Sequence, residues 1–481
     1  MDEGIFTSLK QLFRKCFRQD AENISPMPVS GSNRHYFRLT GNGISAIGVY
    51  NTDAKENRAF LSFTAHFLSK GLPVPRILAS NLEQNIYIEE DLGDETLFSF
   101  RSRQPDFNGQ LKSKYRQALE YLLEFQTKGV EGMDSMWCYP RAAFDGQSIA
   151  WDLNYFKYYF LKLAGVPFDE QLLENDFQTL TQFLLQADSR FFLFRDFQSR
   201  NIMLRGNEVF FIDYQGGRKG ALPYDVASLL YDGKADIPAE VRKELSEYYL
   251  ERLHESGVWP VEKFRKYYPG FVLIRILQAM GSYGYRGFYE QKSHFLTSVP
   301  YALRNVEYLL GNAEMNVEIP HLREVLLSLP DSEKLKAISG GGLTLLIRSF
   351  SFKRGLPEDD GGHGGGFVFD CRCLPNPGRE AAFRHLTGKQ PEVVAYLEKE
   401  GSVAVFFEHV KALAESAVDN YRIRGFSHLS VSFGCTGGQH RSVYFAERLA
   451  RHFQTKYPQI RVCLHHCAET DWELGTKHCE S

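Results

Sequence analysis

Asp196, Asn201 and Asp213 have the side-chain types and the spacing that phosphoryl transfer requires. Four residues separate Asp196 from Asn201, and Asp213 directly follows the apolar run 209–212. Kinase-like folds use such a loop and strand to bring a proton acceptor and two metal ligands to one nucleotide. Asp196 would orient the acceptor hydroxyl and take its proton. Asn201 and Asp213 would hold Mg²⁺ through oxygen atoms, which this hard cation prefers.

The flanking segments decide between such a site and three unrelated surface polar residues. An Asp and an Asn at this spacing are common by chance, so the spacing alone does not distinguish the two. Residues 191–194, 202–204 and 209–212 are apolar and strand-like, which is typical of short strands on either side of a functional loop. We therefore interpret the three residues as one site.

The elements before this site predict a small β-rich lobe followed by a larger helical lobe. Residues 5–17 have apolar side chains at helical spacing, and the small and polar residues 28–39 suit a loop that lies over phosphates. We expect a strand at 46–50 and a strand that runs into an acidic turn over 86–93. We expect helices at 55–69 (which carries Glu56), 111–126, 152–163 and 172–185.

A second region begins after residue 330 and alternates strands with helices. We expect strands at 343–350, 368–370, 429–433 and 461–465, and helices at 393–407, 410–418 and 442–453. This alternation is typical of a mainly parallel sheet. The predicted fold is an α+β bilobal, protein-kinase-like domain (1–325), a linker (326–341), a smaller α/β domain (342–470) and a tail (471–481).

The segment 433–442 joins a predicted strand to a predicted helix and could bind an anion. Its glycines allow the backbone to aim several N–H groups at one point, the helix N-terminus adds positive potential, and Arg441 adds a bidentate donor. A structural turn with a buried Cys435 is the alternative. The pattern Cys435-x5-Arg441-Ser442 also fits a cysteine phosphatase, with Asp370 as general acid. Gly434 stands where those enzymes usually carry His.

A third possibility for the second region is a metal site. Cysteines and histidines cluster near the C-terminus at Cys463, His465, His466, Cys467, His478 and Cys479, with Cys371 and Cys373 upstream. No pair has C-x2-C spacing, and alternate residues of a strand point in opposite directions. A structural zinc site needs four convergent ligands.

The composition bounds the classes of protein. The chain has 481 residues, of which 43% are hydrophobic and 24% charged, with a net charge of −3, so we expect two or three domains and no whole-chain nucleic-acid binder. Eight cysteines without a regular framework indicate reduced thiols. The start of the chain lacks a signal-peptide pattern, and no apolar run is long enough to span a bilayer. We expect a cytoplasmic protein.

Residues 1 to about 325 resemble the aminoglycoside phosphotransferase/choline kinase superfamily. The similarity lies in residues 34–39, 71–75, 90–94, 195–201, 212–215 and 224–230. Within it, the chain is most similar to the anomeric sugar kinases of cell-wall recycling, which phosphorylate N-acetylmuramate and N-acetylglucosamine. The resemblance implies that Asp196 is the catalytic base and that Asn201 and Asp213 bind Mg²⁺.

Two positions depart from the superfamily pattern. Phe194 replaces the usual His, and the strand 46–50 has no Lys, an absence that the anomeric kinases share. The missing positive charge must come from elsewhere, and Arg34 and Arg38 are candidates.

Residues 342–470 resemble the C-terminal domain of the RNase adapter RapZ. The similarity lies in residues 349–353, 355–357, 369–372, 374–377, 386–388 and 434–444. That family domain senses glucosamine-6-phosphate and takes part in small-RNA binding. The resemblance implies sugar-phosphate ligands at Cys435, Thr436, Gly437, Gly438, His440 and Arg441. Arg354 replaces a common His, and residues 475–481 (Gly-Thr-Lys-His-Cys-Glu-Ser) replace the family's basic tail, so RNA binding stays open.

Together these patterns predict an ATP- and Mg²⁺-dependent kinase for an amino sugar, fused to a domain that senses a sugar phosphate. Ser32, Asn33, Arg34 and Glu90 are the expected nucleotide-binding residues. The alternatives are a non-catalytic, RNase-adapter-like regulator that binds RNA or protein, and a phosphatase in the second domain. We expect no membrane partner.

Overall fold

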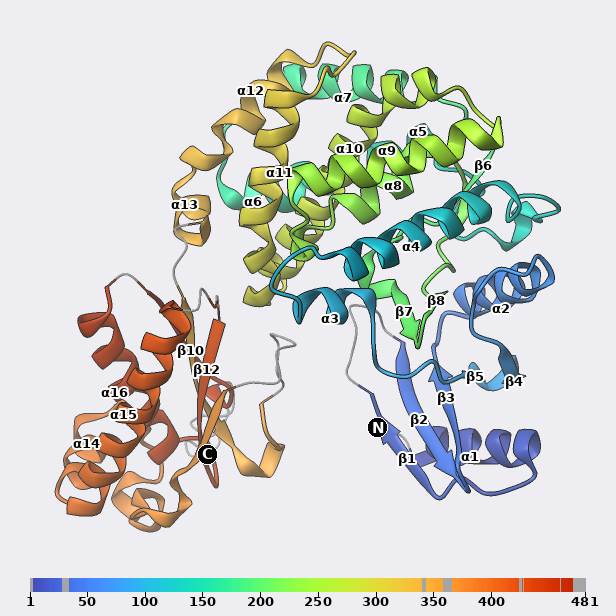
Figure 1. The fold of residues 1–481 in the computed structure, drawn as a ribbon. Coiled ribbons are helices and arrows are strands. Elements are labelled where there is room, and N and C mark those ends of the chain that lie inside the picture. The colour runs from blue at the N-terminus through green and yellow to red at the C-terminus, as the bar shows by residue number, and fades with distance from the viewer. Residues whose placement is uncertain are drawn as a thin grey trace. The chain divides into compact units, whose positions relative to one another are not determined.

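The computed structural model describes residues 3–27, 34–339, 343–357, 366–423, 426, 428–458 and 460–469 (Figure 1). Its internal contacts divide the chain into two compact units. One consists of Met1–Tyr289 and Ser298–Ser332, and the other of Glu290–Thr297 and Glu333–Ser481. Among the described residues, no helix combines the length and the apolar character needed to cross a bilayer.

The first unit begins with a five-stranded antiparallel sheet whose order is β1-β2-β3-β5-β4. The strands are β1 (Asn23–Pro26), β2 (His35–Gly41), β3 (Ile44–Tyr50), β4 (Ile77–Asn81) and β5 (Ile86–Glu90). Alternate side chains of a strand face opposite sides, and each side is covered by one helix. α1 (Glu3–Phe17) buries Leu9 and Phe13 against Ile86 and Ile88. On the other face, Phe60 of α2 (Ala54–Ser69) stacks on Tyr87 at 5.4 Å.

Helices form most of the rest of this unit. They are α3 (Leu97–Ser102), α4 (Gly109–Thr127), α5 (Gly146–Phe156), α6 (Lys162–Ala164), α7 (Glu170–Leu184), α8 (Pro223–Leu230), α9 (Ala239–Ser256), α10 (Val261–Gly284), α11 (Val299–Asn312) and α12 (Pro320–Ser328). α10 is buried over most of its circumference, against α5, α8 and α11, as its apolar residues on all sides require. Two short antiparallel pairs, β6 (Phe191–Leu193) with β9 (Arg218–Gly220) and β7 (Ile202–Arg205) with β8 (Glu208–Phe211), border the predicted catalytic loop.

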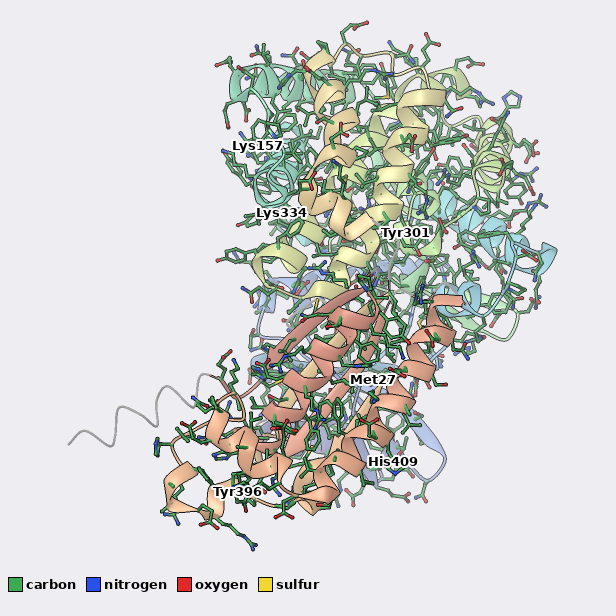
Figure 2. All side chains as sticks on the ribbon, turned by 90° about the vertical axis from the view of Figure 1, so that its left-hand side faces the viewer. Met27, Lys157, Tyr301, Lys334, Tyr396 and His409 are labelled. Atoms are coloured by element: carbon green, nitrogen blue, oxygen red, sulfur yellow. The ribbon has the colours of Figure 1, made fainter. Side chains whose placement is uncertain are left out.

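The second unit is built on a four-stranded parallel sheet of order β11-β12-β10-β13. Its strands are β10 (Thr344–Ser351), β11 (Phe367–Asp370), β12 (His428–Cys435) and β13 (Arg461–His466), and its longer helices are α14 (Pro391–Glu398), α15 (Gly401–Ile423) and α16 (Arg441–Lys456). Figure 2 labels Tyr396 on α14 and His409 on α15. The fold is thus the predicted bilobal α+β domain followed by a smaller α/β domain.

Two sequence-based boundaries differ from the structure. The stretch 326–341, expected as a linker, is largely helical where it is described, because α12 and α13 (Glu333–Ser339) occupy it. The carboxylate of Asp176 accepts the backbone N–H of Leu322 at 2.7 Å at the start of α12, and Leu322 and Leu326 are buried. The helix break expected between residues 407 and 410 lies instead at residues 399–400.

Candidate functional site

A buried carboxylate holds the backbone of the loop that carries Asp196. Asp225, in the first turn of α8, accepts the backbone N–H groups of Phe194 at 2.6 Å and of Arg195 at 3.0 Å. Burial raises the pKa of Asp225 to about 7, although these two N–H groups lower it. The carboxyl, whose side chain is fully buried, therefore serves as an anchor of the loop.

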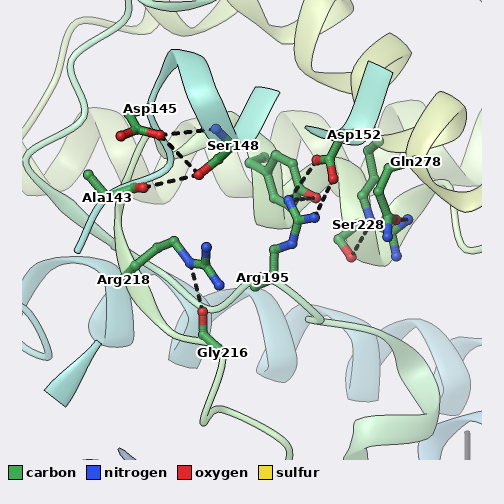
Figure 3. A network of polar contacts seen from close by, with 11 residues as sticks. Ala143, Asp145, Ser148, Asp152, Arg195, Gly216, Arg218, Ser228 and Gln278 are labelled. Atoms are coloured by element: carbon green, nitrogen blue, oxygen red, sulfur yellow. Dashed lines mark hydrogen bonds and ion pairs between the residues drawn. The ribbon is translucent and has the colours of Figure 1, made fainter. Parts of the chain in front are cut away.

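Arg195 provides a second anchor. Its guanidinium donates to both carboxylate oxygens of Asp152 on α5, at 2.6 and 2.8 Å, and to the Tyr224 hydroxyl at 2.8 Å (Figure 3). Its backbone φ of 84° lies in the left-handed region, which is unfavourable for a long side chain and persists only where neighbours enforce it. These contacts hold the backbone of the next residue, Asp196, in a defined position.

The structure brings Asp196, Asn201 and Asp213 together. The Asn201 amide nitrogen donates to the Asp196 carbonyl at 2.8 Å and to Asp213 Oδ2 at 3.0 Å. Gln215 donates to Asp213 Oδ1 at 2.7 Å, and the backbone N–H of Ile212 donates to the Asn201 carbonyl at 3.1 Å. The loop and the strand end predicted from the sequence therefore form one hydrogen-bonded group.

The charges of this group fit a divalent cation. Burial raises the pKa of Asp213, and the negative charge of Asp196 raises it further. A cation held by Asp213 would offset both effects. The Asp213 carboxylate and the amide oxygen of Asn201 are hard oxygen donors of the kind that Mg²⁺ prefers, so the side chains present fit this metal.

The expected nucleotide-binding residues have different surroundings. Ser32 and Asn33 lie outside the described residues. Arg34 is buried, and its Nη2 lies 3.4 Å from Glu56 Oε1 on α2. The Glu90 carboxylate accepts hydrogen bonds from Arg76 at 3.1 Å and Arg205 at 2.7 Å. Burial raises the pKa of Glu90, but these hydrogen bonds lower it overall. The carboxylate of Glu90 is therefore occupied by two arginines.

At both positions that depart from the superfamily pattern, apolar side chains are packed in the core. Phe194 is buried and its ring contacts those of Phe125, at 5.6 Å, and Phe197, at 5.2 Å. On β3, Ile47 and Val49 are buried. The space that a His or a Lys would occupy thus belongs to the hydrophobic core.

The second unit contains a cavity of about 230 Å³ at the C-terminal end of β12. It is lined by Lys353, Asn376, Gly378, Arg384, Cys435, Thr436, Gly437, Gln439, His440 and Arg441. Ligands of parallel sheets commonly bind at this edge, where a loop leads into a helix N-terminus. Three of the lining side chains are cationic and none is acidic, so the cavity suits an anion.

Arg441 shapes this cavity. Its Nη1 donates to the backbone carbonyls of Leu374 at 2.8 Å and Arg372 at 3.1 Å. Within the described part of the chain, its buried Nε has no hydrogen-bond partner. One side of the guanidinium is therefore fixed to the wall, while donor capacity remains for a ligand.

Five of the six residues expected to bind a sugar phosphate line the cavity. The sixth, Gly438, supports it from behind. Its φ is +67°, and a Cβ atom there would lie 3.0 Å from Ala468 Cβ and 3.1 Å from the Ser351 nitrogen. Sequence reasoning missed Lys353, Asn376, Gly378, Arg384 and Gln439 as lining residues, although Lys353, Asn376 and Gln439 lie in the segments that carry the RapZ resemblance.

Only some of the residues that a cysteine phosphatase needs lie at the cavity. Cys435 Sγ lies 3.1 Å from Ser442 Oγ, as a nucleophile supported by a hydroxyl would. Asp370, the expected general acid, is held by Arg372 in a bidentate pair with a shortest distance of 2.7 Å and does not line the cavity. Among the described residues, the expected general acid is therefore not at the cavity.

For the metal hypothesis, no group of three or more His, Cys, Asp or Glu suited to a metal ion occurs among the described residues. His478 and Cys479 lie outside them. His466 instead forms a buried polar network, in which its Nδ1 lies 2.8 Å from Ser349 Oγ and its Nε2 lies 3.2 Å from Glu447 Oε1.

Comparison with known proteins assigns both parts of the chain. A model of the phosphotransferase enzyme family matches residues 23–262, and a model of the RapZ C-terminal domain matches residues 343–468. A nucleotide-binding protein of Thioalkalivibrio sulfidiphilus is 45% identical over 122 residues, 25% of this chain and 41% of the relative. One of Delftia acidovorans is 33% identical over 228 residues, 45% of this chain and 70% of the relative. The chain thus spans less than half of the Thioalkalivibrio relative.

Solved structures with some likeness are kinases of small molecules. The choline kinase LicA of Streptococcus pneumoniae is 13% identical, with a TM-score of 0.42, over 64% of this chain and 99% of that chain. A choline kinase of Cryptosporidium parvum is 15% identical, with a TM-score of 0.45, over 68% of this chain and 100% of that chain. From the family matches, the chain belongs to the phosphotransferase enzyme family in its first part and to the RapZ C-terminal domain family in its second.

Proposed function

We propose that the first unit transfers a phosphoryl group from ATP to a hydroxyl group of a small molecule. The observation that carries this proposal is the hydrogen-bonded group of Asp196, Asn201 and Asp213, in a domain of the phosphotransferase family. Asp196 would accept the proton of the attacking hydroxyl at its carboxylate. Asn201 and Asp213 would hold Mg²⁺, which neutralises phosphate charge when bound.

The acceptor we propose is an amino sugar of the kind released in cell-wall turnover. The support is the resemblance of residues 1 to about 325 to the anomeric sugar kinases, including their lack of a lysine on the strand that is β3 here. An ATP-dependent kinase of this kind would act in the cytoplasm, where the nucleotide is available.

For the second unit, we propose that the cavity beside Arg441 binds a sugar phosphate. Lys353, Arg384 and Arg441 supply positive charge around a volume of about 230 Å³. Drug-sized ligands use pockets of roughly 300–1,000 Å³, so the cavity suits something smaller, such as a phosphorylated monosaccharide. The acid-free lining favours this role over a phosphatase.

The test of the kinase proposal is ATP consumption with a panel of amino sugars, followed by phosphorus NMR of the product. Wild type should transfer phosphate to at least one sugar, and an anomeric phosphate is distinguishable from a 6-phosphate. Asp196→Asn should lose roughly 10²–10⁴-fold in rate, which is the usual contribution of a general base, while its thermal unfolding is unchanged. Equal rates for the two proteins would refute the proposal.

The rival function is a non-catalytic regulator in which the first unit is a scaffold. The apolar packing of Phe194, Ile47 and Val49 favours this rival, because those positions lack the polar groups of most kinases. It predicts no transfer by either protein, together with a salt-dependent gel shift of short RNAs or capture of a protein partner.

A further inference from the structure

The strand β3 lacks the cation that kinase-like sites place there. In such sites a lysine of this strand contacts the nucleotide phosphates and pairs with a glutamate of the neighbouring helix. Here the side chains of β3 that point away from α1 include Ile47 and Val49, opposite Glu89 and Tyr87 of β5. The glutamate is nevertheless present, as Glu56 of α2.

Arg34 contacts the helix that carries the glutamate partner of such a lysine. It directly precedes β2 and is 2% exposed. Its Nη2 is 3.4 Å from Glu56 Oε1, and its guanidinium carbon is 5.5 Å from the centre of the Phe60 ring. Both partners belong to α2. The arginine therefore reaches the same helix that a strand lysine would reach, from the adjacent strand.

Glu56 is itself fixed for this purpose. Its Oε2 accepts the side-chain amide of Asn51 at 2.7 Å, which leaves Oε1 toward Arg34. Asn51 is 2% exposed, and its carbonyl accepts the Asn57 side chain at 2.7 Å. Asn51, just after β3, thus positions the Glu56 carboxylate, which in turn contacts Arg34.

The charge of Arg34 also acts on the predicted metal ligand. It lowers the pKa of Asp213, which burial and Asp196 raise, and it lowers that of Glu89, which burial raises to about 8. Arg34 therefore lies within electrostatic range of both Glu56 and Asp213.

We propose that Arg34 binds the nucleotide phosphates in place of the missing strand lysine, and that Glu56 is its positioning residue. This inference rests on the proposed kinase function. A guanidinium can contact two phosphate oxygens at once, so it supplies at least the donors that a lysine would.

Arg38, four positions further along the chain and inside β2, offers a matched control. Its guanidinium is bidentate on Asp91, at 2.8 and 3.1 Å, and contacts Asp94 at 2.8 Å. These acids occupy its donors. Removing it changes the local charge by the same amount as removing Arg34, but takes no cation from the space beside Asp213.

The experiment compares binding of two probes to the full chain by calorimetry. The probes are AMP-PNP with Mg²⁺, which carries phosphates, and adenosine, which does not. Arg34→Met should weaken AMP-PNP binding roughly 10- to 100-fold, as expected for lost hydrogen bonds between charged groups, and leave adenosine binding unchanged. Arg34→Lys should restore most of the loss, and Arg38→Met should bind both probes like wild type.

Glu56→Gln keeps the test decisive if Arg34→Met does not fold. A positioning role predicts weaker AMP-PNP binding with unchanged adenosine binding, whereas a merely structural role would weaken both. The role of Arg34 is refuted if Arg34→Met binds AMP-PNP as wild type does. It is also refuted if Arg38→Met loses as much AMP-PNP affinity as Arg34→Met. A wild type that binds adenosine and AMP-PNP equally, and transfers no phosphate, would refute the kinase proposal itself.

Discussion

Glu89 is a carboxyl group that burial keeps protonated around neutral pH. Its pKa is raised to about 8, because desolvation outweighs the attraction of Arg34, and Tyr87 and Tyr36 complete its surroundings. Its Oε2 has no hydrogen-bond partner among the described residues. The folded protein therefore binds this proton more tightly than the unfolded chain does, so the associated stability is complete below the unfolded pKa and is lost as pH rises toward 8.

This linkage predicts the behaviour of Glu89→Gln, which imitates the protonated acid at every pH. The variant should match the wild type in unfolding free energy near pH 4. It should become progressively more stable than the wild type as pH increases, with a constant difference above about pH 8. Urea unfolding at several pH values measures the difference. A difference that is largest at low pH would contradict the assigned protonation state.

The pair of Arg195 with Asp152 should contribute strongly to stability because it is buried. The side chains are 17% and 7% exposed, and loss of one partner leaves an uncompensated buried charge, which costs roughly 3–5 kcal/mol. Asp152→Ala should therefore lower the unfolding free energy by about that amount. Asp370 and Arg372 have the same bidentate geometry but are 45% and 49% exposed, so Asp370→Ala should leave stability unchanged. Equal effects would show that burial is not the cause.

Sequence reasoning found the site residues that lie close to one another along the chain. Asp196, Asn201 and Asp213 lie within one short loop and hairpin, so their spacing along the chain already encodes their spacing in the fold. Arg34 was expected near the nucleotide, but its pairing with Glu56 joins two elements that meet only after packing. The pairing of Glu90 with Arg205 is likewise a tertiary contact, and it could not be foreseen from the acidic turn alone.

At the scale of elements, the loop between β12 and α16 depends on one of its two adjacent glycines. Gly438 has a φ of +67° and no room for a Cβ atom beside Ala468 and the Ser351 nitrogen. Gly437 has neither constraint. Gly438→Ala should lower the unfolding free energy of the second unit by roughly 1–2 kcal/mol or more, through left-handed strain and contact. Gly437→Ala should not lower it. Thermal unfolding compares the two, and equal losses would contradict this account of the loop.

Several helices and strands were predictable because their apolar residues follow one clear periodicity. In α16, the buried residues Ala446, Leu449, Ala450 and Phe453 have helical spacing. In β12, apolar residues alternate with serines, which is the period of a strand. The stretch 326–341 contains only the end of α12 and the short helix α13. The start of α12, just before this stretch, is held by the hydrogen bond from the Leu322 N–H to Asp176 of α7.

At the scale of the whole molecule, the chain consists of two units that each bury a core of their own. The sheet and α1 enclose one cluster in the first unit, and the parallel sheet with α15 and α16 encloses another in the second. The two candidate sites therefore belong to separately packed structures. Such a division allows one site to report on a metabolite while the other performs chemistry, because neither site has to share its residues.

If the second unit regulates the first, the coupling must be reciprocal. Saturating glucosamine-6-phosphate should change the affinity for AMP-PNP with Mg²⁺ by roughly 5- to 150-fold, which corresponds to a coupling free energy of about 1–3 kcal/mol. Linkage then requires that saturating AMP-PNP with Mg²⁺ change the affinity for glucosamine-6-phosphate by the same factor. Calorimetry in both directions measures the two factors. Arg441→Gln, which removes a guanidinium from the cavity, should weaken the binding of glucosamine-6-phosphate. The change in AMP-PNP affinity should then require higher concentrations of glucosamine-6-phosphate. A factor of one in both directions would establish that the two units bind their ligands independently.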